Sequence, residues 1–259
     1  MRDILNIGKS GMQSFQEKTD ILSNNIANVN TEGYKRINKS FIELVRTEAG
    51  HLGTPLSEDL NSEKRIMSSG AKTSSEYRDF QQGALIQTND RLQLAIDGMG
   101  YFGVEDSNNQ TLLTRNIRVS ISGNGNLVDQ NGLKIIMTEQ RNLSRYSNED
   151  LEVSESGGIF IKEGGAKVGQ LTLFKPENEQ RLLSVGKGYY GNPDSMAITQ
   201  STGRERSFGN IRQGYKENSN VDLGEEIVEL IITQRAYQMN SKSIEAADDM
   251  WKTANNLRG

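Results

Sequence analysis

The 259-residue chain contains no cysteine and only one histidine, His51. The lack of thiols excludes disulfides, thiolate metal sites and cysteine nucleophiles. A single imidazole leaves no zinc site built from several histidines, and it nearly excludes a serine–histidine triad elsewhere in the chain. His51 stands between Gly50 and Gly53 in a polar stretch, so we predict a solvent-exposed loop residue there. The sequence therefore predicts no metal site and no cofactor.

Apolar residues are also scarce, since 34% of the chain is hydrophobic and 6% is aromatic. Such content is low for a self-contained globule of this length, which suggests that partners supply part of the apolar contact area. No run approaches the ~20 apolar residues that a transmembrane helix needs. A secretory signal is not recognisable either, because residues 8–17 are polar and no cleavage site follows. We therefore expect no membrane insertion, and export by another route if the protein works outside the cytoplasm.

Neither sign of charge dominates the chain. Charged residues make up 25% of it, the formal net charge is -4, and both signs are interspersed. Such a surface offers no general attraction to nucleic acid or to anionic membranes. A function that depends on a basic patch is therefore disfavoured.

The N-terminal segment has the pattern of a long helix with one apolar side. Steps of four and three residues keep that side facing a partner. The helix is expected from about Ile4 to Val29, because Asn30, Thr31 and Gly33 are helix breakers. Seven of the nine positions on this side are apolar: Met1, Leu5, Gly8, Met12, Phe15, Thr19, Leu22, Ile26 and Val29.

A second long helix is predicted at the other end of the chain. Asp222 is its expected N-cap, with Glu225 three residues later in a capping-box arrangement. A row with seven-residue spacing consists of Leu223, Leu230, Tyr237, Ile244 and Trp251, and it is widened by Ile227, Val228, Ile231 and Ile232. The companion row becomes polar at Gln234, Ser241 and Asp248. This pattern favours packing among several neighbours over one dry two-stranded coil.

The length of the two helices supports contacts with other subunits. At ~1.5 Å per residue, residues 1–29 would extend ~44 Å and residues 222–257 ~54 Å, which exceeds the width of a small domain. The alternative is two amphipathic helices that cover the core of an ordinary globular domain.

The middle of the chain has the pattern of short β-strands. Asn-Gly and Asp-Gly pairs, which suit tight hairpins, separate apolar segments. The strands are expected at residues 92–96, 101–104, 112–119, 126–128, 134–137, 151–153, 158–162, 168–174, 182–185 and 211–215. Ser195–Gly209 is expected to be a return loop, whereas residues 34–45 could be a second helix or an extended segment.

The fold class that follows is α+β, with the long N- and C-terminal helices packing as a coiled-coil-like unit beside a central, mostly antiparallel all-β domain. The chain divides into an N-terminal helix and signature at 1–45, a linker or mobile loop at 46–79, the β domain at 80–215 and the C-terminal helix at 216–259.

Three blocks of the sequence carry a resemblance to one family. The first is Ser23-Asn24-Asn25-Ile26-Ala27-Asn28-Val29-Asn30-Thr31-Glu32-Gly33-Tyr34-Lys35. The second comprises Leu94 to Phe102, Thr114-Arg115-Asn116 and Gly125 to Gly132, and the third runs from Ser219 to Lys242. These blocks resemble the N-terminal, central and C-terminal signatures of the bacterial flagellar rod and hook axial proteins. Glu32 stands where that family usually has proline, and Ile117 where it commonly has glycine.

The resemblance implies a structural subunit of the flagellar basal-body rod, not an enzyme. Such a subunit polymerises through its terminal helices into a hollow helical shaft that transmits torque from motor to hook. The resemblance also implies export by the flagellar type III apparatus without a cleaved signal peptide, and partners in other copies, neighbouring rod and hook proteins and the rings around the rod. Within the family, Gln82–Asp90 looks most like the distal rod members. A proximal rod subunit and a coiled-coil adaptor unrelated to flagella are the alternatives.

The residues expected at subunit interfaces come from both terminal segments. Asparagine amides there can cap helix ends or bond neighbouring subunits, and for the cluster the interface is favoured. The expected interface residues are Leu5, Met12, Phe15, Leu22, Asn24, Asn25, Ile26, Asn28, Val29, Thr31, Gly33, Tyr34, Leu223, Ile227, Leu230, Tyr237, Ile244 and Trp251. Catalysis is not expected, because the carboxylates Asp97, Glu105, Asp106 and Asp129 fall in solvated turns without an acid–base pattern.

Overall fold

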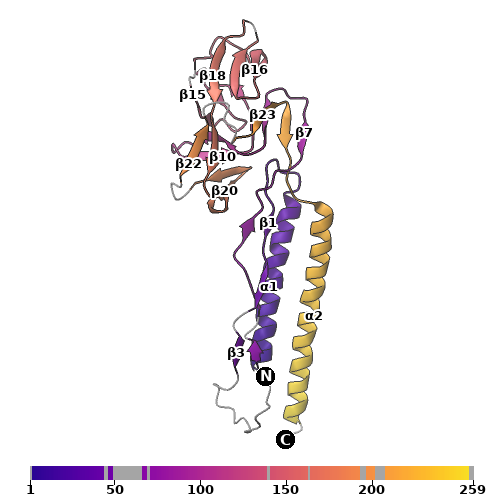
Figure 1. Ribbon diagram of the computed structural model, residues 1–259. Helices are drawn as coiled ribbons and strands as arrows, with labels where there is room; N and C mark the ends of the chain where they lie inside the picture. Colours follow the sequence, from indigo (N-terminus) through magenta and orange to yellow (C-terminus); the bar gives the residue numbers. More distant parts are fainter. Residues whose placement is uncertain are drawn as a thin grey trace. The chain divides into compact units, whose positions relative to one another are not determined.

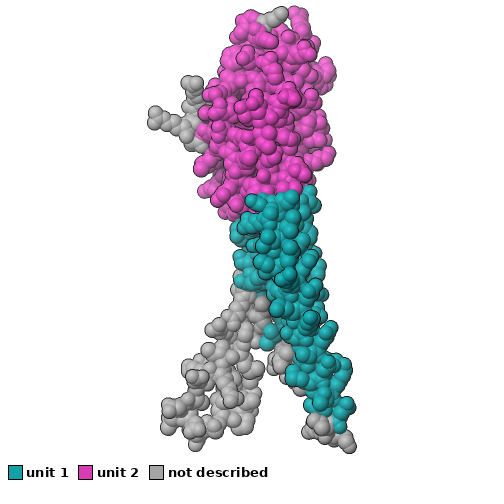
Figure 2. Space-filling model, turned by 90° about the vertical axis from the view of Figure 1, so that its right-hand side faces the viewer, with its two compact units in different colours: residues 1–27, 37–78, 222–259 teal, residues 28–36, 79–221 magenta. Residues whose placement is uncertain are grey.

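The computed structural model describes residues 2–43, 46–48, 66–68, 71–138, 141–162, 164–192, 197–201 and 208–256, with side chains omitted at 2–4, 42–43, 46–48, 66–68 and 71. His51 lies outside the described residues. The chain forms two compact units, coloured separately in Figure 2. Unit 1 comprises Met1–Ala27, Ile37–Arg78 and Asp222–Gly259, and unit 2 comprises Asn28–Arg36 and Asp79–Val221.

Unit 1 is built on two long helices, one from each end of the chain. Helix α1 spans Arg2–Ala27 and helix α2 spans Leu223–Asn256 (Figure 1). The predicted N-cap is confirmed, because the Asp222 carboxylate accepts the backbone N–H groups of Gly224 at 2.8 Å and Glu225 at 3.2 Å. The helices run antiparallel, so that residues near the start of α1 lie beside the second half of α2.

Three short strand pairs form in the segment that follows α1 in the sequence. The pairs are β1 (Ile37–Asn38) with β6 (Tyr77–Arg78), β2 (Phe41–Glu43) with β5 (Ala71–Thr73), and β3 (Arg46–Glu48) with β4 (Ile66–Ser68), all antiparallel. Within residues 34–45, the described part of unit 1 is therefore extended rather than helical. The ring of Phe41, in β2, packs edge-on against the ring of Phe15, with their centroids 5.2 Å apart. This contact holds the β2–β5 pair against α1.

Unit 2 is all β, and every strand pairing in the described part of the chain is antiparallel. Its largest sheet has nine strands: β9 (Tyr101–Glu105), β10 (Thr111–Thr114), β12 (Ser120–Ile121), β13 (Leu127–Val128), β14 (Lys134–Ile135), β19 (Leu173–Pro176), β20 (Leu183–Gly186), β21 (Tyr189–Gly191) and β22 (Ile198–Ser201).

Three smaller sheets complete unit 2. One has four strands: β15 (Met137–Thr138), β16 (Leu151–Val153), β17 (Gly158–Ile161) and β18 (Lys167–Leu171). Another has three: β8 (Gln93–Asp97), β11 (Asn116–Arg118) and β23 (Asn210–Gln213). The last is the pair of β7 (Leu85–Gln87) and β24 (Tyr215–Glu217).

The core of unit 2 comes from the inward-facing residues of these sheets. Leu94, Ile96, Val104 and Leu127 are all 0% exposed. The predicted Asn131-Gly132 turn joins β13 to β14, and Gly132 has a φ of +79°, where a side chain would be strained. Alternating apolar residues and tight turns thus explain the antiparallel fold.

Two expectations about the middle of the chain need correction. The segment Ser195–Gly209 is not simply a return loop, because Ile198–Ser201 forms β22 and pairs with β19. Seven further strands were not expected either, since each has only two or three residues and too short an alternation to recognise. They are β3, β4, β5 and β6 within the expected linker at 46–79, and β7, β12 and β21 in unit 2.

Candidate assembly surface and buried polar clasp

Helix α2 buries few apolar side chains and leaves several of them exposed in its first turns. The buried positions of α2 are Glu226, Thr233 and Ala247. Four apolar side chains in the first three turns face solvent, with Ile227 42%, Val228 56%, Ile231 47% and Ile232 61% exposed. We call these four residues the outer stripe. An amphipathic helix of a finished globule has the opposite arrangement.

Small residues on α1 allow the two helices to approach closely. A Cβ atom on Gly8 would lie 2.6 Å from Cγ1 of Ile244, and one on Gly11 would lie 2.6 Å from Nδ2 of Asn240. The Asn240 amide donates a hydrogen bond to the carbonyl of Gly8 at 2.9 Å. The helix pair is therefore joined by glycines, an amide and a few half-buried apolar side chains.

A shallow groove of about 440 Å³ lies on the helix pair near the start of α1. Its apolar walls are Leu5, Met12, Tyr237 and Ile244, and its polar lining is Lys9, Gln13 and Gln16. The groove and the outer stripe lie at different positions along the helix pair, since the groove includes Tyr237 and Ile244 of α2 and the stripe ends at Ile232.

Asn25 binds the end of α1 to β1. Its amide donates to the carbonyl of Ile37 at 2.9 Å and accepts the N–H of the same residue at 3.0 Å, as a neighbouring strand would. It also donates to the buried carboxylate of Glu226 at 3.1 Å. Asn25 is 0% exposed, so these contacts within unit 1 engage the whole side chain.

The predicted interface residues differ in where the structure places them. Leu22, Asn25 and Gly33 are buried. The exposed ones are Leu5, Asn24, Leu223, Ile227 and Trp251. The half-buried ones are Met12, Phe15, Ile26, Asn28, Val29, Thr31, Tyr34, Leu230, Tyr237 and Ile244.

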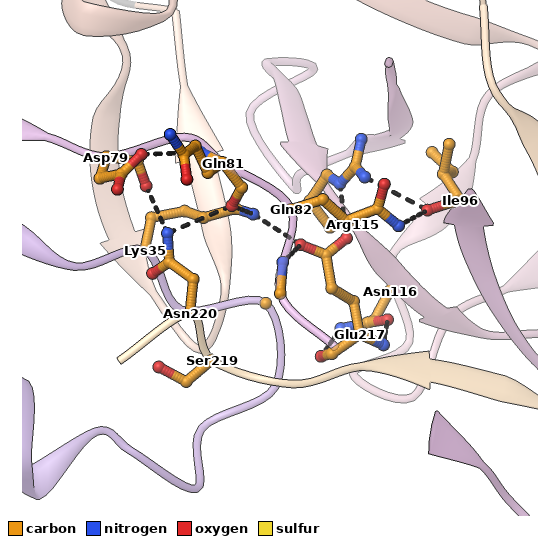
Figure 3. A network of polar contacts seen from close by, with 12 residues as sticks. Lys35, Asp79, Gln81, Gln82, Ile96, Arg115, Asn116, Glu217, Ser219 and Asn220 are labelled. Atoms are coloured by element: carbon orange, nitrogen blue, oxygen red, sulfur yellow. Dashed lines mark hydrogen bonds and ion pairs between the residues drawn. The ribbon is translucent and has the colours of Figure 1, made fainter. Parts of the chain in front are cut away.

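Unit 2 contains a buried charge cluster that the sequence did not predict. Glu217 is 0% exposed and accepts the Lys35 ammonium at 2.5 Å and the Arg115 Nε at 2.8 Å (Figure 3). The backbone N–H of Gly83 donates to the same carboxylate at 3.1 Å. We call Lys35, Arg115, Glu217 and the groups bonded to them the clasp.

Carbonyl oxygens complete the solvation of the two cations in the clasp. Lys35 donates to the carbonyl of Gln81 at 2.6 Å. Arg115 donates to the carbonyls of Gly100 at 2.5 Å and Ile96 at 3.2 Å. Burial lowers the pKa of Lys35, and the nearby Glu217 carboxylate partly offsets this effect. Each charge is thus bonded on several sides, as buried ions require.

Two asparagines tie further backbone into the clasp. Asn116 accepts the N–H of Glu217 at 2.7 Å and donates to its carbonyl at 2.8 Å, and the N–H of Gly33 donates to that carbonyl at 3.0 Å. Asn220 accepts the N–H of Arg36 at 2.7 Å and donates to the carbonyl of Asp79 at 2.8 Å. Parts of all three signature blocks therefore converge in one network.

One expected solvated carboxylate is in fact buried. Asp129 is 2% exposed, accepts the hydroxyl of Tyr189, and receives the N–H groups of Asn131 at 2.8 Å and Leu133 at 2.9 Å. The pKa of Tyr189 is raised, mainly by burial and then by this hydrogen bond. Asp129 thus stabilises the β13–β14 turn.

The described residues contain no group of three or more His, Cys, Asp or Glu side chains placed to hold a metal ion. Among the helices of the same part of the chain, none is long and apolar enough to cross a membrane.

An antiparallel pair of terminal helices with apolar side chains turned outward, together with an all-β unit, defines a structural subunit of the axial type. Three family matches agree with this class: "Flagella basal body rod protein" at residues 5–35, "Flagellar hook protein FlgE/F/G D1 domain" at 95–165, and "Flagellar basal body rod FlgEFG protein C-terminal" at 212–257. These ranges contain the N-terminal signature, most of the central signature and the C-terminal signature.

Comparison with individual proteins extends the similarity to nearly the full chain. The flagellar basal-body rod protein FlgG of Agrobacterium fabrum is 34% identical over 95% of both chains. FlgG of Caulobacter vibrioides is 35% identical over 98% of both, whereas the rod protein FlgF of the same organism is 29% identical over 98% of this chain and 97% of its own. The chain therefore belongs to the flagellar basal-body rod protein family. It is a FlgG-like, distal rod subunit, a structural and not an enzymatic component.

Glu217 is the central residue that sequence reasoning missed. It stands between Lys216 and Asn218 in a polar stretch, where no periodicity distinguishes a buried carboxylate from a solvated one. Lys35, Arg115, Asn116 and Asn220 lie within the recognised signatures, but their common carboxylate partner became visible only in the fold.

Proposed function

We propose that copies of this chain stack through their terminal helices into a hollow helical shaft that carries torque from motor to hook. The supporting observation is the outward position of Ile227, Val228, Ile231 and Ile232. Burying one such side chain fully between neighbours would stabilise an assembly by roughly 1.5 to 3 kcal/mol. In a lone subunit these apolar side chains stay in water, so they do not contribute this free energy.

The groove is the proposed receptor for the outer stripe of the next copy. The stripe is centred near residue 229 of α2 and the groove near residue 240, so the two are about 11 residues, or ~16 Å, apart along the helix. A contact between two different surfaces of identical subunits does not close on itself unless its rotation closes a ring, and otherwise it generates an open helical polymer. This type of contact suits a shaft.

A charged substitution in the outer stripe tests whether it drives assembly. Ile227→Asp should abolish polymers while the β unit stays folded, because it places a charge in an apolar contact. Gln238→Asp, at an exposed polar position of the same helix, is the matched control and should polymerise. Sedimentation and electron microscopy of both proteins measure this. Normal shafts from Ile227→Asp would refute the assignment.

Disulfide cross-linking tests the pairing of the outer stripe and the groove. The chain has no cysteine of its own, so only the introduced cysteines can form disulfides. A chain with both Leu5→Cys and Ile231→Cys should form disulfide-linked ladders under assembly conditions, whereas neither single variant should link. A disulfide inside one molecule is not expected. Leu5 lines the groove together with Ile244, and Ile244 is 13 residues, or ~20 Å, from Ile231 along α2, which is too far for this bond. Ladders from a single variant, or polymers without any link, would contradict this pairing.

The proposed partners beyond further copies are adjacent rod and hook proteins, the rings around the rod and the flagellar type III export apparatus. The higher identity to FlgG than to FlgF of the same organism supports a position in the distal rod rather than the proximal rod. A labelled chain located in isolated basal bodies tests this position. Label at the hook end of the rod is expected, and label confined to the motor end would favour the proximal alternative.

A further inference from the structure

The clasp joins segments that are far apart in the chain, and all of them belong to unit 2. Lys35 comes from residues 28–36, whereas Gly83, Glu217 and Asn220 come from residues 79–221. The bonds from Lys35, Gly83 and Asn220 connect these segments in one network. Glu217 is the last charged member of the clasp in the sequence.

With Glu217 the clasp holds two cations and one anion, whereas without it the two cations would have no bonded carboxylate. Lys35 and Arg115 are 1% and 4% exposed, and Glu217 is the carboxylate to which both of these side chains are bonded. Burial of two cations without this anion is strongly unfavourable. The backbone N–H groups of Gly33 and Gly83 would also lose their acceptors on Glu217.

We propose that the clasp acts as a completion lock, which keeps the Gly33–Arg36 segment undocked until the C-terminal part of the chain arrives. Synthesis and any threading from the N-terminus deliver Glu217 long after Lys35 and Arg115. In a chain that lacks this part, Lys35 and Arg115 stay solvated and the Gly33–Arg36 segment stays undocked. The lock is a property of the single subunit and does not depend on assembly.

A neighbouring ion pair provides the matched control. Lys216 binds Glu32 at 3.0 Å, but the two side chains are 31% and 38% exposed. Exposed pairs of this kind contribute little to stability. The control therefore removes one lysine next to Glu217 without leaving a buried charge.

Pulse-labelled hydrogen exchange during refolding of the full chain tests the order of events. The amides of Gly33 and Gly83 should become protected together with that of Glu217, and later than that of the core residue Val104. Protection of Gly33 or Gly83 before Glu217 would overturn the lock.

Equilibrium exchange of three variants tests the role of charge. Glu217→Gln should reduce protection at Gly33 and Gly83 by about 100-fold or more, and Lys216→Gln by less than about fivefold. Adding Lys35→Met to Glu217→Gln removes one of the unbalanced cations and should restore at least about tenfold of the protection. Retained protection in Glu217→Gln, an equal loss in Lys216→Gln, or no recovery in the double variant, including failure of both Glu217 variants to fold, would each overturn it.

Discussion

The two units of this protein place apolar and polar side chains in opposite ways. In unit 2, leucine, isoleucine and valine fill the interior, and the buried charges of the clasp are bonded to one another. In unit 1, the buried residues of the two helices include polar Asn25, Glu226 and Thr233 beside apolar Leu22 and Ala247, while the outer stripe of α2 faces solvent. The difference teaches that unit 2 buries its apolar side chains within itself, whereas unit 1 leaves in solvent the apolar stripe that we propose as a contact between subunits.

The largest expected contrast is between a core residue of unit 2 and a residue of the outer stripe of α2. Leu113→Ala, at a 0% exposed position of β10, should lower the free energy of unfolding of unit 2 by about 2 to 5 kcal/mol. Ile232→Ala, at a 61% exposed position, should change the stability of a dilute monomer by no more than about 0.5 kcal/mol. Urea denaturation measures both. Equal losses would remove the distinction between the units.

The asparagine signature gives a second, smaller contrast within unit 1. Asn25→Ala should cost about 1 to 3 kcal/mol, because the backbone of Ile37 and the buried Glu226 lose their partner. The adjacent Asn24 is exposed, so Asn24→Ala should cost much less. Thermal unfolding of the two variants compares them, and a similar loss would mean that neighbouring position rather than burial matters.

The glycines of α1 test how closely the helix pair packs. Gly8→Ala should destabilise unit 1 by about 1 to 2 kcal/mol, since overpacking against Ile244 exceeds the gain in helix propensity. Gly224→Ala is the control, because its new Cβ would come no closer than 3.3 Å to its nearest atom, an oxygen of the Asp222 carboxylate, compared with 2.6 Å at Gly8. Circular dichroism melts should show a loss only for Gly8→Ala. An unchanged melt would mean that the helices separate easily.

The smallest expected effect is a dependence of unit 1 on pH. The Thr73 hydroxyl and then the Lys39 ammonium hold the pKa of Glu17 below its usual value of 4.5. Because the folded pKa is lowered, this carboxylate stabilises unit 1 above about pH 4.5, and the contribution is lost as the pH falls through the folded pKa. Solvent screening limits it to at most about 1 kcal/mol. The stability difference from Glu17→Gln should shrink between pH 7 and pH 3, and a constant difference would contradict the pKa shift.

The sequence predicted those elements whose signals are local. The Asp222 cap, the Asn131-Gly132 turn and the two long helices each depend on residues within a few positions of one another, and the structure confirms them. Most strands of unit 2 also followed from alternation and turn residues.

The face of α2 that meets α1 could not be predicted in the same way. A row beginning at Leu223 can be completed by the row of Ile227 or by that of Glu226, and the large apolar side chain at Ile227 favours the first. The structure buries the second, with Glu226, Thr233 and Ala247. The rule that apolar side chains face inward does not hold for the outer stripe, whose partner we propose to be another subunit. Glu217 could not be predicted because the residues bonded to it are distant in sequence.

The hydrogen bond from the N–H of Gly33 to the carbonyl of Glu217 has a mechanical consequence. Residues 28–36 follow α1 and residues 217–221 precede α2, so these two backbone strands are the immediate attachments of the terminal helices. Gly33 is bonded to the backbone carbonyl of Glu217, and Lys35 is bonded to its carboxylate. Tension applied to either helix therefore reaches the bonds around Glu217, and the two segments can separate at Gly33 and Glu217 only when those bonds break.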